Sequence, residues 1–223
     1  MMEELYMKKL FVILFVLICS IGAAFAEVVG VTPEGRHIVA HEADNGQMLY
    51  CISWVEEPRV LREDVNFDGV EDYVFSIGGG ADNYLCEFFV WDGAKYVLTM
   101  HPCTDDYSIK GPICNYELYP EYGLVYAYVN IGENGNHFVK YLMRWEGTDL
   151  VLLRRADGRF YSSYDEEDDA HIVRQYWERV EVDVRDYARD QWGSVLYSRV
   201  LSLEEMNEDV HNQVDDALWQ GIK

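Results

Sequence analysis

The sequence predicts a mainly β protein made of antiparallel strands, with one helix near its C-terminus. Aromatic and β-branched residues recur in short runs that end at Gly, Asn or Asp, which is typical of strands and turns. Two of these runs share one pattern, in which an aromatic strand ends in Trp-acid-Gly and an apolar strand follows. We therefore expect repeated antiparallel units, arranged as a β-propeller-like fold or as a β-meander.

The two copies of this pattern cover residues 83–98 and 137–152, and Trp91 and Trp145 stand at equivalent places. A looser third copy is Leu49–Trp54, followed by an apolar segment from Arg59. In each Trp-acid-Gly segment the acidic residue and Gly are expected to close a tight hairpin, over which Trp packs.

The last third of the chain predicts a long strand pair and a helix. Residues 172–187 alternate well enough for a long strand, and residues 194–201 return alongside it. Ser202 and Glu205 form a capping box, and apolar residues at helical spacing continue to about Trp219. We expect this helix to cap the fold by covering an open end or edge of the sheet.

Residues 1–26 have the pattern of a secretory signal peptide. Lys8 and Lys9 precede an apolar run that is too short for a stable membrane span, and Ala24-Phe25-Ala26 is a small-x-small cleavage site. A lipid anchor at Cys19 is the alternative, although Ile18 stands where a small residue is expected. We expect one β-rich domain over residues 27–223, periplasmic or secreted, with no membrane insertion after cleavage.

The chain is strongly acidic, with 40 Asp and Glu against 18 Lys and Arg and a formal net charge of −22. Such a surface repels nucleic acid and anionic lipid, so neither is expected as a partner. It suits a divalent cation or a basic protein, although solubility alone is the simpler explanation of the charge.

Cys51, Cys86, Cys103 and Cys114 remain after cleavage. An even number of cysteines in an exported chain predicts two disulfides, for which three pairings are open. Cys103 and Cys114 flank a loop that contains Gly and Pro, so a local bond between them is the first choice. Cys51 and Cys86 would then pair between strands.

The segment Asp64–Asp72, with the sequence Asp-Val-Asn-Phe-Asp-Gly-Val-Glu-Asp, has the spacing of a calcium loop. Calcium takes about 6–8 oxygen ligands, so a short chain must turn tightly to aim several oxygens at one point. Alternate residues supply those oxygens, and Gly69 permits the turn. We predict side-chain ligands at Asp64, Asn66, Asp68 and Asp72. Val70 would supply its backbone carbonyl.

This loop departs from an EF-hand at its end. Phe75 stands at loop position 12, where an EF-hand has a bidentate Glu, and residues 73–77 read as a strand. Such loops are typical of extracellular β-repeat proteins. A hairpin turn rich in Asn, Asp and Gly that binds no metal is the alternative.

Residues 63–98 resemble a group of exported bacterial proteins with FG-GAP or VCBS-type calcium loops. The resemblance rests on the Asp64–Asp72 loop, the strand and Gly-rich segment after it, and the aromatic strand that ends in Trp91-Asp92-Gly93. One branch looks like the periplasmic immunity proteins that inhibit lysozyme-like effectors from neighbouring bacteria. The resemblance implies a β-propeller-like fold and supports the calcium ligands named above, but it supplies no inhibitory loop.

The sequence favours a non-enzymatic, exported calcium-binding β domain that binds an envelope protein or a cell-wall glycan. Inhibition of a basic lysozyme-like hydrolase is its sharpest form, and Tyr84 is the candidate contact, with core packing as the alternative role. No catalytic or cofactor-binding residue can be assigned, because the chain has no nucleophile motif or phosphate loop and no carboxylate pair stands out. A secreted hydrolase acting on a cell-wall or carbohydrate substrate is the alternative function.

Overall fold

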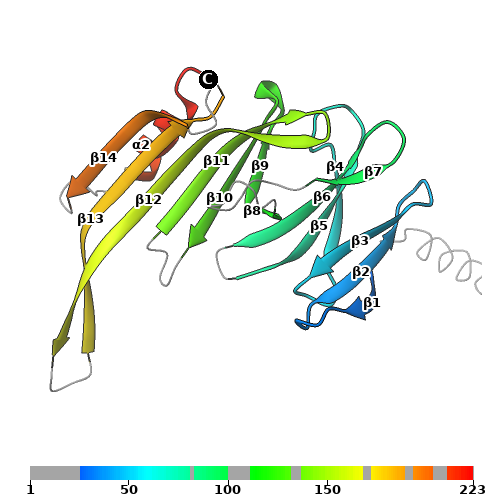
Figure 1. Ribbon diagram of the computed structural model, residues 1–223, viewed down its shortest axis with the longest axis horizontal. Helices are drawn as coiled ribbons and strands as arrows, with labels where there is room; N and C mark the ends of the chain where they lie inside the picture. Colours follow the sequence, from blue (N-terminus) through cyan, green and yellow to red (C-terminus); the bar gives the residue numbers. More distant parts are fainter. Residues whose placement is uncertain are drawn as a thin grey trace, which may run out of the picture.

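The computed structural model describes residues 26–80, 83–99, 111–131, 137–167, 172–188, 193–202 and 210–222. These residues form three antiparallel sheets and a short C-terminal helix, so the predicted mainly β class is confirmed (Figure 1). The predicted leader lies outside the described residues except for Ala26. Within the described ranges, no helix is long and apolar enough to cross a membrane.

The first sheet contains β1 (Glu27–Val31), β2 (His37–Glu42) and β3 (Met48–Ser53). The second contains β4 (Arg59–Glu63), β5 (Asp72–Gly79), β6 (Tyr84–Trp91) and β7 (Tyr96–Thr99), and the short β8 (Ile113–Cys114) also pairs with β6. The third contains β9 (Tyr116–Tyr119), β10 (Leu124–Ile131), β11 (His137–Glu146), β12 (Asp149–Glu167), β13 (Ile172–Asp186) and β14 (Ser194–Ser202). A 3-10 turn, η1 (Pro120–Tyr122), follows β9, and α2 (Val210–Trp219) follows β14.

Successive strands pair in chain order within each sheet, which is the connectivity of a meander. The described strands form neither a closed barrel nor a propeller. The two Trp-acid-Gly segments do close hairpins, β6–β7 and β11–β12, at which Gly93 and Gly147 adopt φ values of 97° and 65°. The third copy closes no hairpin, because β3 and β4 belong to different sheets.

The three sheets and α2 are stacked in chain order, with a hydrophobic cluster between each pair of layers (Figure 1). Strand β5 lies in the second sheet and is buried on both faces. Its Tyr73, Phe75 and Ile77 join the cluster shared with the first sheet, and Val74 joins the cluster shared with the third sheet. Burial on both sides explains why this strand reads as a continuous apolar run in the sequence.

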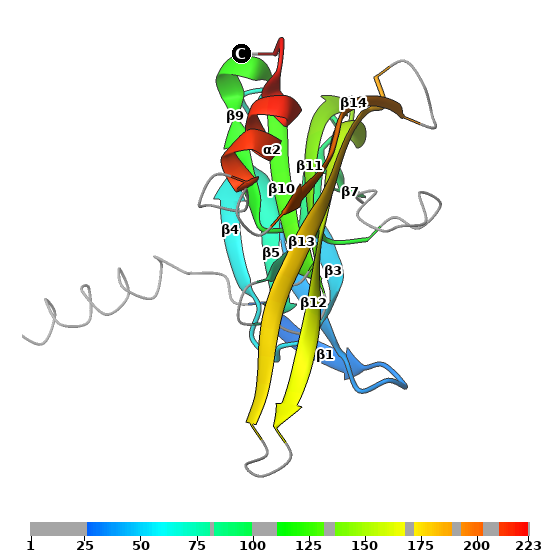
Figure 2. The ribbon, with the colours of Figure 1, turned by 90° about the vertical axis from the view of Figure 1, so that its left-hand side faces the viewer.

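Helix α2 covers one face of the third sheet, so the prediction that it covers an end or an edge was wrong (Figure 2). Val180, Val182 and Val184 alternate along β13 and present an apolar stripe on that face. The helix packs Val214 and Leu218 against this stripe. A face with such a stripe buries more apolar surface than an edge could, which is why the helix lies there. The expected capping box falls partly on residues outside the described ranges.

Candidate metal centre

The Asp64–Asp72 loop joins β4 to β5 at the end of their hairpin, where Glu63 and Asp72 form the last pair. Two residues in it have left-handed backbone conformations, Phe67 with φ 64° and Gly69 with φ 87°. A positive φ is uncommon for a residue with a side chain and costs free energy, so the tight turn is held by its other contacts.

Hydrogen bonds inside the loop turn its oxygens toward its own backbone. The Asp64 carboxylate accepts from the N–H groups of Asp68 and Gly69 at 3.0 and 2.9 Å. Asn66 Oδ1 accepts from the N–H of Asp68 at 3.2 Å, and its Nδ2 donates to Asp68 Oδ2 at 2.8 Å. Asp68 Oδ1 in turn accepts from the N–H of Val70 at 2.8 Å. Three of the predicted ligand side chains are thus gathered on one side of the turn.

Asp72 differs from the other predicted ligands because it is fully buried. Its Oδ2 accepts from the N–H of Val65 at 3.2 Å, and its Oδ1 accepts from the N–H of Trp91 at 2.8 Å. The pKa of this carboxyl is raised to about 6, chiefly by burial and in smaller part by the nearby Asp68 and Asp64 carboxylates, against the lowering effect of the two N–H donors. Asp72 therefore ties the loop to β6 and also holds a costly negative charge beneath it.

The loop is also anchored to the third sheet. Val65 is fully buried in the cluster between the second and third sheets, and Phe67 packs against the same cluster. Trp145 Nε1 donates a hydrogen bond of 2.6 Å to the carbonyl of Val65. The Trp of the second Trp-acid-Gly hairpin thus fixes the loop from the opposite layer.

The donor set fits a hard divalent cation in kind, since it offers carboxylate and amide oxygens around one turn. A bound oxygen still has a second lone pair, so an accepted N–H bond does not prevent coordination. The Val70 side chain is exposed and leaves its carbonyl for this role. However, in the described part of the chain no three His, Cys, Asp or Glu groups already stand as a metal-binding cluster. Calcium binding at this loop stays a prediction.

Tyr84 lies on the surface, because 64% of the residue is exposed, so core packing does not explain it. It begins β6, directly opposite Gly79 of β5. A bridge of two amide side chains holds this end of the hairpin. Asn115 Oδ1 accepts from the N–H of Tyr84 at 2.8 Å, and Asn83 exchanges two hydrogen bonds with the backbone of Asn130, at 2.7 and 3.0 Å. The tyrosine is therefore presented from a fixed position.

Cys51, Cys86 and Cys114 are buried free thiols in the structure, and Cys103 lies outside the described residues. Burial raises the pKa of Cys51 and of Cys86 to about 12 and that of Cys114 to about 11. On the paired strands β6 and β8, Cys86 is opposite Ile113 and Cys114 is opposite Leu85, whereas Cys51 belongs to the cluster on the other side of the second sheet. Two disulfides remain a prediction, and their pairing stays open.

The sequence reasoning missed a polar surface on β12 and β13, which lines a pocket of about 700 Å³. A sequence signal for it exists. Every second residue from Arg155 to Tyr161 and from Glu181 to Tyr187 is charged or is a tyrosine, and the intervening residues are mostly apolar. The alternation of the second segment was read only as evidence for a strand.

No family model, no curated protein and no solved structure matches this chain. Its class is therefore defined by its own features. It is a meander of three stacked antiparallel sheets that carries an Asp- and Asn-rich loop between β4 and β5.

Proposed function

We propose that this chain is an exported, calcium-binding β domain that binds a protein or glycan of the cell envelope. In its sharpest form it inhibits a basic lysozyme-like hydrolase. The observation that carries the proposal is the buried Asp72 carboxyl beneath the Asp64–Asp68 turn, whose pKa is raised by burial and by the nearby Asp68 and Asp64 carboxylates. A divalent cation at this place would reverse that cost, because it favours the charged form of each carboxylate.

Calcium would be held by Asp64, Asn66, Asp68 and Asp72, with the carbonyl of Val70. When bound, the ion supplies positive charge that locks the β4–β5 turn. Contacts from the ordered turn then hold strand β6 in place. Asp72 reaches the backbone of β6 at Trp91, and Tyr84 stands at the other end of the same strand. The role of the metal is therefore structural, and it holds the strand that presents Tyr84.

The partner-binding part of the proposal rests on Tyr84 and on charge. An exposed tyrosine on a rigid hairpin supplies contact area at low entropic cost. A net charge of −22 would attract a basic protein and speed its encounter with this surface. Kinship with FG-GAP-type repeat proteins is part of the same proposal and is supported by the loop and by the two Trp-acid-Gly hairpins.

A cell-wall turbidity assay against a panel of basic muramidases tests this function. The wild-type domain should slow clearing by at least one muramidase, and Tyr84→Ala should slow it less. Tyr50→Ala is the matched control, because Tyr50 is also a strongly exposed tyrosine but lies on the first sheet. Inhibition should weaken as salt is added, since exposed charges are screened within about 8 Å at physiological ionic strength.

No inhibition across the panel would contradict the inhibitor form of the proposal. Clearing of the wall by this protein alone would replace it with the hydrolase alternative.

A further inference from the structure

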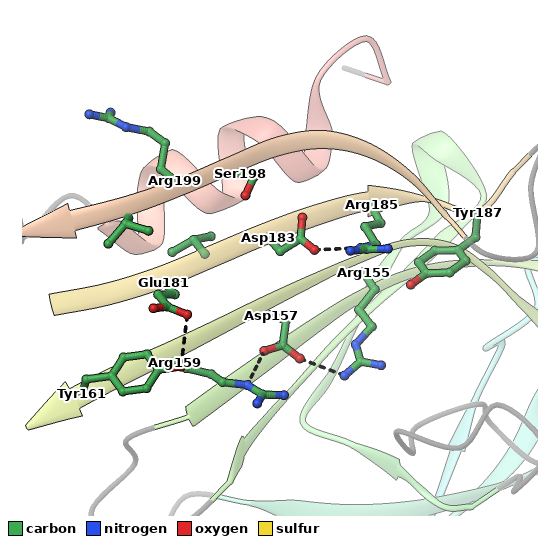
Figure 3. A pocket seen from close by; sticks show the side chains of 12 residues that line it. Arg155, Asp157, Arg159, Tyr161, Glu181, Asp183, Arg185, Tyr187, Ser198 and Arg199 are labelled. Carbon is green, nitrogen blue, oxygen red and sulfur yellow. Dashed lines mark hydrogen bonds and ion pairs between the residues drawn. The ribbon is translucent and has the colours of Figure 1, made fainter.

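The third sheet carries a polar surface on the face opposite α2. It consists of alternate residues, four from β12, three from β13, and Tyr187 just after β13: Arg155, Asp157, Arg159, Tyr161, Glu181, Asp183, Arg185 and Tyr187. These side chains line the pocket of about 700 Å³ together with Ser198 and Val200 of β14 (Figure 3). Arg199 points away from the group, as its position opposite Val182 requires.

Like charges stand directly opposite each other on this surface. Arg155 is paired in register with Arg185, and Asp157 is paired with Asp183. Side chains in such positions have Cβ atoms about 4.5–5.5 Å apart, and like charges there destabilise the sheet. If each Arg were opposite an Asp instead, the same four residues would attract each other across the strands and this repulsion would be absent. Folding alone therefore gives no reason for two guanidinium groups side by side and two carboxylates beside them.

Ion pairs along each strand fix the two guanidinium groups in place. Arg155 Nη2 donates to Asp157 at 2.9 Å, and Arg185 Nε donates to Asp183 at 2.7 Å. Asp157 is further held by Arg159 Nε at 3.3 Å and by His137 Nε2 at 3.0 Å. The Arg185 side chain is 42% exposed, so a ligand in the pocket can reach it, whereas the Arg155 side chain is only 10% exposed. The planar Arg185 guanidinium matches the two oxygens of one carboxylate, and the buried Arg155 adds positive charge beside it.

Hydrogen-bond acceptors lie beside the arginines. Asp183 Oδ1 is buried, and no donor in the described part of the chain reaches it. A buried acceptor without a donor is costly, and a ligand hydroxyl would satisfy it. Glu181 accepts from the hydroxyl of Tyr161 at 3.0 Å and extends the row of acceptors along β13. The pocket thus offers cationic donors at one end and anionic acceptors next to them.

A ligand that complements this surface carries one carboxylate and several hydroxyl groups. A bare anion gains from the arginines alone and has no hydroxyl contacts that would offset its entry into the field of a chain with net charge −22. A neutral sugar gains from the acceptors alone. We propose that the pocket binds the carboxylate-bearing sugar of an acidic glycan, with Arg185 on the carboxylate and Asp183 accepting from a hydroxyl. This deepens the glycan form of the proposed function and rests on it for the glycan's location in the envelope.

Isothermal titration of the mature chain with glucuronate, methyl glucoside, glutamate and inorganic phosphate tests the proposal. Glucuronate should bind at least tenfold more tightly than each of the other three probes. Arg185→Gln should weaken glucuronate binding at least tenfold, and Asp183→Asn should weaken it several-fold. Arg144→Gln is the matched control and should change nothing, because Arg144 also pairs with a carboxylate two residues along its strand, Glu146, but lies outside the pocket.

Equal binding of glucuronate and methyl glucoside would overturn the proposal, as would unchanged affinity in Arg185→Gln. Tighter binding of phosphate or of glutamate would also overturn it, since these point to a simple anion site or to an amino-acid site. The muramidase assay reports separately on Tyr84. Glucuronate binding without muramidase inhibition would leave this inference standing and remove only the inhibitor form of the function.

Discussion

Glu87 lies in β6, opposite the fully buried Phe75 of β5. Burial raises the pKa of its carboxyl to about 7, and no partner in the described residues reaches its Oε2 atom. The negative charge of Glu87 also contributes to the raised pKa of Cys51 in the neighbouring first sheet. A charged residue in this position makes the stability of the fold depend on pH.

The sign of that dependence follows from the protons bound in each state. Between the ordinary Glu pKa of 4.5 and about 7, the folded protein keeps a proton that the unfolded chain has lost, so stability falls as pH rises through this window. Glu87→Gln removes this loss and should be more stable than wild type at pH 8, by about 1–3 kcal/mol. At pH 4 the two proteins should be nearly equal. Urea unfolding at both pH values measures the difference in stability. Equal stability of Glu87→Gln and wild type at pH 8 would contradict a raised pKa of Glu87 in the folded protein.

Single residues divide clearly into those that the sequence can predict and those that it cannot. Calcium ligands could be predicted at Asp64–Asp72 because a calcium loop is local, with every donor within nine residues. The partnership of Asp72 with Trp91, and of Val65 with Trp145, depends on which layers meet and has no local signal. Arg155 is opposite Arg185 because of the register of two strands, which also has no local signal.

At the scale of elements, Arg154 of β12 joins the third sheet to α2. Its Nη1 donates to the carbonyls of Leu218 and Gln220, at 2.7 and 2.8 Å, at the end of the helix. The last carbonyls of a helix lack partners within it and carry partial negative charge, so a cation there is favourable.

Arg154→Ala should therefore weaken the docking of α2. Hydrogen bonds to a charged group contribute about 1.5–3 kcal/mol, and the loss in free energy of unfolding should lie in that range. Chemical denaturation followed by circular dichroism measures it. The control is Arg144→Ala, which removes an exposed ion pair with Glu146 and should change stability by less than about 1 kcal/mol. Equal effects of the two substitutions would show that the helix contact contributes nothing.

Elements with local signals were predicted well. Both Trp-acid-Gly segments close hairpins, and β13 and β14 match the strands expected at 172–187 and 194–201. The placement of α2 was wrong because an amphipathic helix reveals its apolar side but not the surface that it meets. The third hairpin failed for a similar reason, since the change of sheet between β3 and β4 has no short-range signature.

At the scale of the whole molecule, the thiols report on the compartment in which the protein folds. Buried thiols resist alkylation in the native state, so labelling must be done in denaturant without reductant. We expect no alkylation of Cys51, Cys86, Cys103 or Cys114 in protein isolated from the envelope. Peptide mapping should then find the four cysteines joined in two disulfides. Alkylation of two or more of these cysteines would contradict the exported, oxidised state.

The charge of the whole molecule was readable from composition, but its distribution was not. An excess of acidic residues predicts, as a general field effect, a surface unsuited to nucleic acid. It does not predict that several of the few arginines gather on β12 and β13, because that grouping arises when two distant segments pair.

Calcium binding at the Asp64–Asp72 loop is the central claim, and thermal melting with and without the ion tests it most directly. A ligand held only by the native state adds about 2.7 kcal/mol at a hundredfold excess over its dissociation constant. The wild-type domain should therefore melt several degrees higher in millimolar calcium than in chelator. Asp68→Ala should melt like the chelated wild type under both conditions.

Asp92→Ala serves as the control for this experiment, because Asp92 accepts the N–H bonds of Ala94 and Lys95 in a turn outside the loop. It should lower the melting temperature but keep the full response to calcium. If the wild-type domain melts at the same temperature in chelator and in millimolar calcium, the loop is a metal-free turn and the proposed calcium binding is wrong.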